Sequence, residues 1–419
     1  MQKLVIEGGN RLSGELNIQG AKNSALPLLA ACILADGETM LHNCPRLSDV
    51  YAACRILGSL GCECKADGND ITVKALSPCG CCVPDELMRE MRSSIVFLGA
   101  VLGRVGECSL SFPGGCELGP RPIDMHLAAL RKMGAEITER YGLLHCVCKG
   151  GLRGADINLG FPSVGATENV MLAAVRARGV TRILNAAREP EITDLAQFLK
   201  CCGARITGEG SGAVTVEGVE KLHGCEYSVM PDRIAAATMM SAAAVTGGEL
   251  ELIGARASDL GAVIPVFEEM GCRIYTYSDR LYISRRGQLS AVSLIRTMPY
   301  PGFPTDAQAP VMAALATAGG TSMIVENIFE NRYRHVDELA RMGASIKAEG
   351  KVAVIDGVPR LYGAKVRAMD LRGGAALAVA ALGAEGITEV SDIKYIDRGY
   401  ESLESQLRAL GAKARRESF

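Results

Sequence analysis

Tryptophan is absent from the sequence, and other aromatic residues are few: 8 Phe and 11 Tyr in 419 residues. No apolar run approaches the ~20 residues that a bilayer-spanning helix needs; the longest, residues 25–34, is interrupted by Pro27. Charge of one sign is also missing, because 45 Lys and Arg against 47 Asp and Glu leave a formal net charge of −2. The sequence therefore predicts no membrane insertion and no nucleic-acid partner.

The hydrophobic content of 48% and the charged content of 22% are ordinary for a globular protein with a large core. The length predicts two or three domains, at roughly 150 residues each. Glycine is frequent, with 48 residues, which indicates many tight turns.

Sixteen cysteines raise the question of disulfides or metal. The chain begins MQKLVIEGGN, with no long apolar region, so we expect no export signal and a cytoplasmic location, where thiols stay reduced. Cys79 and Cys82 have CxxC spacing, but no second pair accompanies them. This pattern favours ordinary thiols over zinc ligands.

The most informative feature is an internal repeat of about 70 residues. In each copy an amphipathic helix ends at a glycine that suits the left-handed position after a helix, and a charged strand follows. A second glycine precedes an earlier short strand in each copy. The order helix, strand, helix, strand, turn, strand predicts an α/β fold, and six copies in this length favour two groups of three. The helix-ending glycines are Gly61, Gly134, Gly203, Gly271, Gly343 and Gly411.

Charged and polar residues recur where the helices of the repeat begin. An arginine precedes the second helix of each copy: Arg46, Arg121, Arg188, Arg256, Arg332 and Arg398. Helix N-termini carry partial positive charge, and arginine matches carboxylate or phosphate, so one interpretation is binding of a multiply charged anion. The other is that the arginines pair with nearby acids inside each copy. Those acids are Asp49, Asp124, Asp194 and Asp259.

Several loops carry candidate chemistry. Cys116 lies in a glycine loop before a helix that begins near Arg121, and positive surroundings make a thiol reactive. Thr305 and Gln308 have the spacing of a capping box, with Asp306 as either a helix-dipole partner or a general base. The residues from Ser163 open another helix whose backbone could hold phosphate. The five histidines show no metal spacing, and we expect them to be packing or surface residues.

An ordered set of motifs runs from the first repeat to the last and resembles one family, the UDP-N-acetylglucosamine enolpyruvyl transferases. The motifs are GAKNSALP, PGGCELGPRPID, FPSVGATEN, AAREPEITDLA, PGFPTDAQA, VENIFENRYRHVDEL, MDLRGGAAL and IDRGYE. The resemblance implies a two-domain inside-out α/β barrel built from six βαβαββ-type repeats. One domain would be residues 22–229, the other residues 1–21 plus 230–419, with the active site in the cleft between them.

The family transfers the enolpyruvyl group of phosphoenolpyruvate to the 3′-hydroxyl of UDP-N-acetylglucosamine and releases phosphate, in peptidoglycan synthesis. The resemblance implies no metal, no cofactor and no obligate protein partner. It assigns Cys116 as proton donor and Asp306 as acceptor of the hydroxyl proton, with Cys116 also the target of fosfomycin. Phosphate and carboxylate would be held by Lys22, Arg121, Arg398, Arg332 and Arg372. The nucleotide sugar would contact Asn23, Arg92, Arg121, Pro122, Ile123, Asp124, Met125, Ser163, Val164, Gly165 and Ile328.

Departures from the family pattern are few: Ala307 replaces an expected Met, and Gly373-Gly374 replaces Ala-Ser. The alternatives are the sister family of 5-enolpyruvylshikimate-3-phosphate synthases and a non-catalytic repeat scaffold. Lys22-Asn23 and the Cys116 loop argue against the first. A scaffold would lack one of Lys22, Cys116, Asp306 or Arg398, yet all of them are present.

Overall fold

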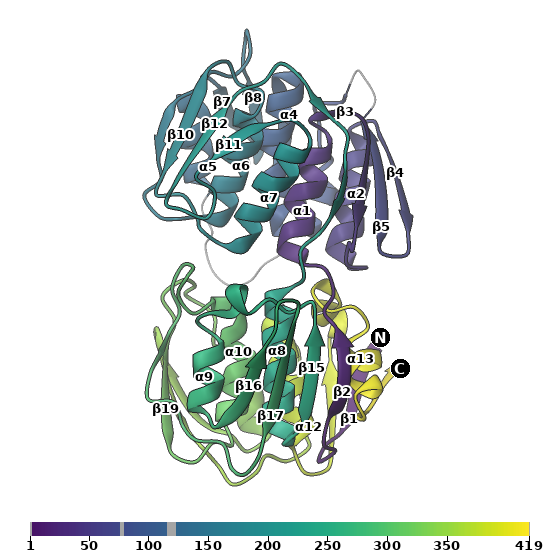
Figure 1. The fold of residues 1–419 in the computed structure, drawn as a ribbon, viewed down its shortest axis with the longest axis vertical. Helices are drawn as coiled ribbons and strands as arrows, with labels where there is room; N and C mark the ends of the chain where they lie inside the picture. The colour runs from purple at the N-terminus through teal and green to yellow at the C-terminus, as the bar shows by residue number, and fades with distance from the viewer. Residues whose placement is uncertain (1, 76–78, 115–122, 419) are drawn as a thin grey trace. The chain divides into compact units, whose positions relative to one another are not determined.

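The computed structural model describes residues 2–75, 79–114 and 123–418, and the chain divides into two compact units. One unit comprises Met1–Gln19 and Pro231–Phe419; the other extends from residue 20 to residue 230, apart from the undescribed segments. No helix in the described residues is long and apolar enough to cross a membrane. The mixture of helices and strands confirms the predicted α/β class (Figure 1).

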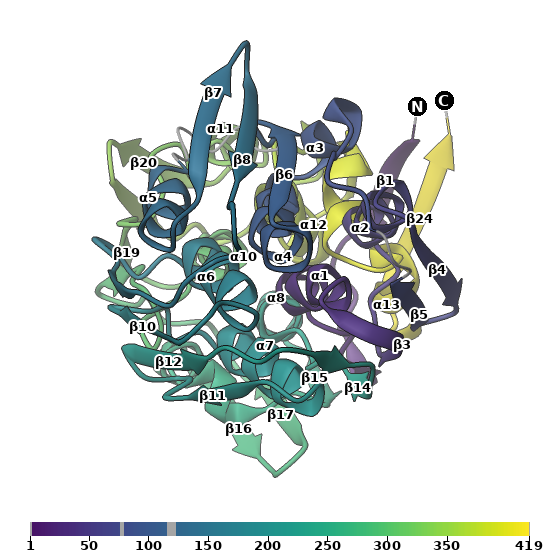
Figure 2. The ribbon, with the colours of Figure 1, turned by 90° about the horizontal axis from the view of Figure 1, so that it is seen from above.

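In the unit of residues 20–230, apolar helices lie at the centre and sheets surround them (Figure 2). A helix that is apolar on all sides has to be buried, and nine of the eleven residues of α1 are. These central helices are α1 (Lys22–Cys32), η1 (Arg92–Val96) with α4 (Phe97–Val105), and α6 (Val164–Ala174). Helices nearer the surface bury one face; they are α2 (Ser48–Ser59), α3 (Asp85–Glu90), α5 (Asp124–Lys132) and α7 (Pro190–Cys201).

The sheets of this unit bury alternate residues, as strands with one solvent face do. One sheet has the order β13-β3-β5-β4, with β14 also paired to β3; the others are β6-β8-β7 and β11-β12-β10-β9. The strands are β3 (Ala35–His42), β4 (Cys62–Asp67), β5 (Asp70–Ala75), β6 (Glu107–Ser111), β7 (Glu136–Arg140), β8 (Leu143–Val147), β9 (Asp156–Asn158), β10 (Val180–Leu184), β11 (Arg205–Thr207), β12 (Ala213–Glu217), β13 (Leu222–His223) and β14 (Glu226–Ser228).

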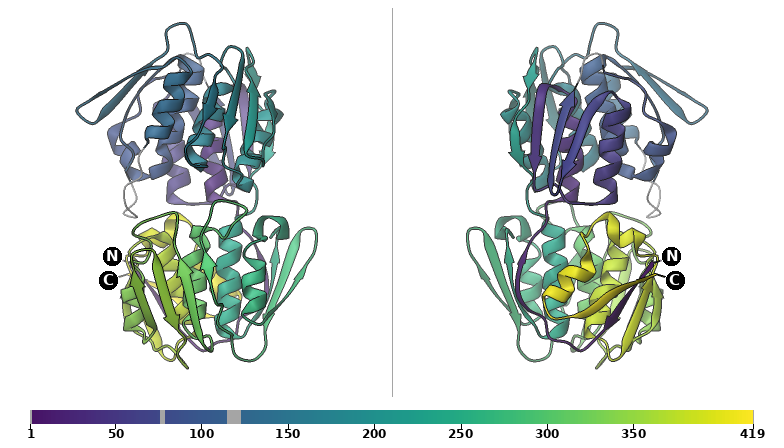
Figure 3. Two further views of the ribbon diagram at one scale, coloured as in Figure 1. Left: turned by 90° about the vertical axis from the view of Figure 1, so that its left-hand side faces the viewer. Right: turned by 90° about the vertical axis from the view of Figure 1, so that its right-hand side faces the viewer.

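The second unit has the same plan, with helices inside and sheets outside (Figure 3). Its central helices, which pack on one another, are α8 (Arg233–Thr246), α10 (Thr305–Leu315) and α12 (Leu371–Gly383). Nearer the surface lie α9 (Ile264–Glu269), α11 (Val336–Arg341), α13 (Leu403–Ala409), and the 3₁₀ turns η2 (Ala257–Leu260) and η3 (Ile393–Arg398).

The first strands of the chain complete two sheets of this second unit, which explains why residues 2–19 belong to it. The sheet orders are β22-β23-β1-β24, β16-β17-β15-β2 and β18-β19-β21-β20. The strands are β1 (Gln2–Glu7), β2 (Ser13–Asn17), β15 (Glu249–Ile253), β16 (Cys272–Thr276), β17 (Arg280–Arg285), β18 (Ile295–Arg296), β19 (Thr321–Val325), β20 (Ser345–Glu349), β21 (Val352–Asp356), β22 (Lys365–Arg367), β23 (Ile387–Ser391) and β24 (Lys413–Ser418).

The glycines that the repeat places after its outer helices adopt the predicted left-handed backbone. Their φ values run from 86° at Gly61 to 100° at Gly203. Gly20, where the chain enters the unit of residues 20–230, meets a different requirement. A Cβ there would lie 1.8 Å from the Asn43 carbonyl oxygen, so only glycine allows this close approach.

Candidate active site

Helices α8, α10 and α12 begin at one end of their unit, and acidic residues lie at these starts. Asp232 caps α8 by accepting from the Ile234 and Ala235 N–H groups at 2.8 and 3.0 Å. Asp370 caps α12 through the N–H groups of residues 372 and 373, at 3.0 and 2.9 Å. Both carboxylates thus satisfy donors that a helix start leaves free.

Helix α10 begins differently, and the capping-box interpretation of Thr305 is wrong. Pro304 occupies the N-cap position in an extended conformation, and no side chain caps the helix. The Thr305 hydroxyl donates instead to Glu326 Oε2 at 2.9 Å. Gln308 is fully buried, and its amide contacts the Met312 sulfur at 3.9 Å rather than the helix start. The first turn of α10 is therefore free to present Asp306.

Two arginines hold the Asp306 carboxylate. Arg332 Nη2 donates to Oδ1 at 2.7 Å, and Arg372 Nη2 lies 3.1 Å from Oδ2. The side chains of both arginines are 3% exposed, whereas that of Asp306 is 27% exposed. The structure thus brings three of the predicted site residues together, and the carboxylate of Asp306 remains partly exposed to solvent between the two arginines.

The arginines have further partners and some unused donors. Arg372 Nη1 donates to the Tyr400 hydroxyl at 3.1 Å, and Arg332 Nη2 donates to the Thr305 carbonyl at 3.1 Å. Burial lowers the pKa of Arg372, but Tyr400 and the carboxylates of Asp306 and Asp232 outweigh burial and raise that pKa overall. Among the described residues, the Nε of each arginine has no hydrogen-bond partner, although buried donors normally have one.

His335 packs behind this cluster as a neutral imidazole. It is 1% exposed, and burial, with a further contribution from the Arg332 charge, lowers its pKa to about 4, although Asp370 acts in the opposite direction. Gly373 allows the close packing, because a Cβ there would lie 2.9 Å from Asp370 Oδ2 and 3.0 Å from the His335 Cβ. This contact gives a physical reason for the glycine that departs from the family pattern.

Glu326 is a site residue that the sequence reasoning missed. It is buried at the end of β19 and accepts from the N–H groups of Ile328 and Phe329 at 2.8 and 3.1 Å. It therefore fixes the predicted Ile328 backbone and, through Thr305, the start of α10. Its place in the VENIFENRYRHVDEL motif was the available signal. Arg398, also predicted, is half-buried at the end of η3.

In the unit of residues 20–230, Lys22 is the first residue of α1 and its ammonium group lies 2.7 Å from Asp49 Oδ2. The lysine side chain is 12% exposed and the aspartate 4%. A buried carboxylate in the first turn of α2 thus holds the charge of Lys22 in place. Asn23 follows in the same turn of α1 and is half-buried.

Ser163 caps α6 by accepting from the Ala166 N–H at 3.3 Å, and Val164 and Gly165 form the first helical positions. The His126 ring packs here, 3.3 Å from where a Gly165 Cβ would be. The Asn169 amide donates to His126 Nδ1 at 2.9 Å, which assigns the ring proton to Nε2. Burial lowers the His126 pKa to about 4, so the ring is neutral.

The other predicted contacts of this unit lie around α5. Arg92, at the start of η1, donates to the Pro113 carbonyl at 3.1 Å. Ile123 is buried just before α5, Asp124 is exposed at its first position and Met125 is half-buried. Three predicted residues, Cys116, Arg121 and Pro122, lie outside the described residues.

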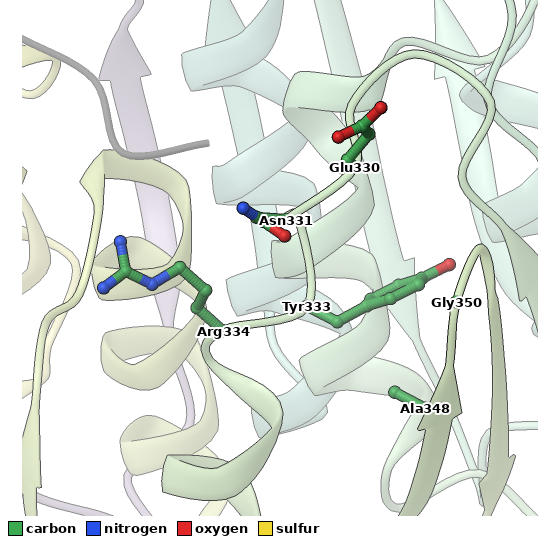
Figure 4. A pocket seen from close by; sticks show the side chains of 6 residues that line it. All are labelled: Glu330, Asn331, Tyr333, Arg334, Ala348 and Gly350. Atoms are coloured by element: carbon green, nitrogen blue, oxygen red, sulfur yellow. The ribbon is translucent and has the colours of Figure 1, made fainter. Parts of the chain in front are cut away.

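A surface pocket of about 590 Å³ lies beside the segment that carries Arg332 (Figure 4). It is lined by Glu330, Asn331, Tyr333, Arg334, Ala348 and Gly350. The Tyr333 hydroxyl donates to the carbonyls of residues 324 and 351 at 3.0 and 3.1 Å, and burial raises its pKa. None of the lining residues belongs to the predicted site, so this pocket is not the candidate active site.

A family model described as EPSP synthase (3-phosphoshikimate 1-carboxyvinyltransferase) matches residues 6–407. The chain is 52% identical over 413 residues, 98% of its length and 99% of the relative's, to UDP-N-acetylglucosamine 1-carboxyvinyltransferase 2 of Caldanaerobacter subterraneus subsp. tengcongensis. It belongs to the enolpyruvyl transferase family. This enolpyruvyl transferase is also 48% identical, over the whole of both chains, to UDP-N-acetylglucosamine 1-carboxyvinyltransferase of Nitratidesulfovibrio vulgaris strain Hildenborough.

Solved structures show the same fold. The enolpyruvyl transferase NikO from Streptomyces tendae matches with a TM-score of 0.90 at 25% identity, covering 100% of this chain and 99% of that one. An EPSP synthase from Acinetobacter baumannii matches with a TM-score of 0.79 at 18% identity over all of both chains. At that identity the second match supports the fold alone.

Proposed function

We propose that this enolpyruvyl transferase transfers the enolpyruvyl group of phosphoenolpyruvate to the 3′-hydroxyl of UDP-N-acetylglucosamine and releases phosphate. This is the first committed step of peptidoglycan precursor synthesis, carried out in the cytoplasm. The observation that carries the proposal is the Asp306 carboxylate held between buried Arg332 and Arg372. Relatives that share about half of their residues with this chain over its full length bear the name of this reaction.

The proposal extends to the domain architecture. The two compact units would be the two domains of an inside-out α/β barrel with three repeats each, and the active site would lie in the cleft between them. Support comes from the element order and from the points where the chain passes between the units, at residues 19–20 and 230–231. Both points lie within three residues of a central helix start, Lys22 in one unit and Arg233 in the other.

The arginine pair suggests how the site changes when substrate binds. In the structure, Asp306 accepts from the Nη2 groups of Arg332 and Arg372. A substrate carboxylate or phosphate would compete for these donors. The carboxylate of Asp306 is then released from its ion pairs and can accept the proton of the sugar hydroxyl.

The chemistry then proceeds in two balanced steps. In the first, the hydroxyl oxygen bonds to C2 of phosphoenolpyruvate, Asp306 takes the hydroxyl proton and the Cys116 thiol gives a proton to C3. In the second, the Cys116 thiolate takes a proton back from C3, the C2–C3 double bond re-forms, and phosphate leaves with the electron pair of the broken C2–O bond. Lys22, Arg121 and Arg398 would hold the phosphate, since fixed cations in a dry site stabilise developing negative charge.

The nucleotide sugar would lie along the unit of residues 20–230. The N-terminus of α6 and the Ser163 cap suit a diphosphate, because free N–H groups and the helix dipole favour anions. Arg92 and the segment Ile123–Met125 would add contacts at the adjacent α5 start. Asn23 and the Ile328 backbone would orient the N-acetyl sugar.

The test is release of inorganic phosphate when purified protein is mixed with phosphoenolpyruvate and an acceptor. We expect release with UDP-N-acetylglucosamine, its abolition by fosfomycin, and no loss when EDTA is added. The family model is named for the shikimate reaction, so shikimate 3-phosphate is the matched control acceptor. Release with shikimate 3-phosphate and not with UDP-N-acetylglucosamine would overturn the proposal.

A further inference from the structure

Asp194 in α7 is a buried carboxylate that the proposed reaction does not use, and it joins separate segments of its unit. It is 8% exposed. Its Oδ2 accepts hydrogen bonds from the Ser24 hydroxyl and, at 3.4 Å, from the Met230 N–H. Its Oδ1 accepts from the Tyr227 hydroxyl at 2.8 Å. One side chain thus binds the first turn of α1 and the segment that leaves the unit.

The Ser24 contact bears on the site, because Ser24 lies in the same helical turn as Lys22 and Asn23. In this turn the Ala21 N–H also donates to the Met230 carbonyl at 2.7 Å. Asp194 therefore fixes the turn from one side, and Asp49 fixes the Lys22 ammonium from another at 2.7 Å. Loss of the Ser24 contact would leave the Lys22 ion pair intact but allow the helix start to shift.

The Tyr227 contact anchors the opposite side of Asp194. The tyrosine hydroxyl also lies 3.2 Å from the Asp194 carbonyl, and its ring packs edge-on to Phe198 at 5.5 Å. These contacts hold β14 to α7 and do not touch α1. Removal of the tyrosine hydroxyl is therefore a matched control, since it takes a donor from the same carboxylate on the side away from the site.

We propose that Asp194 is a positioning residue: through Ser24 it sets the first turn of α1, and so the placement of Lys22 and Asn23 toward phosphoenolpyruvate and the acceptor sugar. The inference rests on the proposed function. It differs from a purely structural role, because it requires that the effect of Asp194 on substrate binding pass through one hydroxyl. Small displacements of a positioned cation are costly to catalysis.

The experiment compares Ser24→Ala, Asp194→Asn, the double variant and Tyr227→Phe by steady-state kinetics and thermal unfolding. We expect the first two to raise the KM for phosphoenolpyruvate roughly tenfold, within the range of coupled neighbours. The double variant should raise it no further than the larger single effect. Ser24→Thr, which keeps the hydroxyl, should stay near wild type. Tyr227→Phe should lower the Tm while its KM stays near wild type.

Additive effects in the double variant, or an equal KM change in Tyr227→Phe, would overturn the inference. So would an unchanged KM in both Ser24→Ala and Asp194→Asn. If the wild-type protein released no phosphate, the proposed function would fail separately. Hydrogen exchange of the amides at residues 23–25 would then test whether Asp194 and Ser24 fix the first turn of α1. It should accelerate in Ser24→Ala and Asp194→Asn and not in Tyr227→Phe.

Discussion

A buried neutral histidine in each unit should make this protein sensitive to mild acid. His126 and His335 both have a pKa lowered to about 4, chiefly by burial, whereas an unfolded histidine titrates near 6.5. Between these values the unfolded chain binds protons that the folded chain does not, so stability falls as pH falls through this window. At pH 5 the linkage amounts to about 2 kcal/mol for each histidine, relative to pH 7.

The assay is urea unfolding at pH 7 and pH 5, followed by far-UV circular dichroism, for wild type, His126→Gln and His335→Gln. Each variant should lose about 2 kcal/mol less than wild type between the two pH values. Glutamine also changes the packing at both positions and the hydrogen bond between His126 and Asn169, so a lower stability at pH 7 is expected. The quantity to compare is therefore the change in the free energy of unfolding between pH 7 and pH 5, because this change isolates the titration of the histidine.

His145 offers a matched control. Its ring is exposed and its Nδ1 lies 2.9 Å from the Ser109 hydroxyl. His145→Gln therefore controls for a glutamine substitution at an exposed histidine. If His126→Gln and His335→Gln lost as much stability as wild type between pH 7 and pH 5, the reasoning that these imidazoles stay neutral in the fold would be refuted.

Other substitutions test single features. Glu168→Gln should stabilise the protein increasingly as pH rises, because burial and then Glu191 and Glu189 raise the Glu168 pKa, and a raised carboxyl pKa costs stability as pH rises; urea unfolding at pH 5 and pH 8 checks this, and equal differences at both would contradict it. Cys116→Asp should retain phosphate release and lose fosfomycin sensitivity, measured by preincubation with the drug; continued inactivation would exclude Cys116 as the alkylated group. Arg398→Ala should weaken phosphoenolpyruvate binding at least tenfold, with little change for the nucleotide sugar, by calorimetry; an equal loss for both would place Arg398 elsewhere.

The scaffold could be predicted from the sequence because it depends on local, repeated signals. A glycine after each outer helix needs positive φ wherever the helix lies, and Gly61 and Gly203 show it at 86° and 100°. The start of α6 near Ser163 was also predicted, and in the structure Ser163 caps that helix. These features follow from the local sequence and do not depend on contacts with other segments of the chain.

Contacts between helices could not be predicted in the same way. The sequence offered Asp49 and Asp194 as partners of arginines in their own repeats. It did not indicate that Asp49 binds Lys22 from another helix, or that Asp194 accepts from Ser24 and Tyr227. Sequence spacing gives neighbours along one helix, whereas these contacts arise where helices from distant segments begin side by side.

The capping-box error has the same origin and shows why the site differs from its scaffold. Thr305 and Gln308 satisfy the local rule, yet Glu326, from a strand end about twenty residues later, takes the threonine hydroxyl. With the helix start capped by neither side chain, Asp306 is left to the arginines. Lys22, Ser163 and Asp306, at the starts of α1, α6 and α10, are only partly buried and so contribute less to the core than the residues that follow them. Equivalent positions in different repeats can therefore carry a lysine, a serine cap or a carboxylate without altering the fold. The repeat predicts which positions carry functional side chains, whereas the partners of those side chains depend on tertiary contacts.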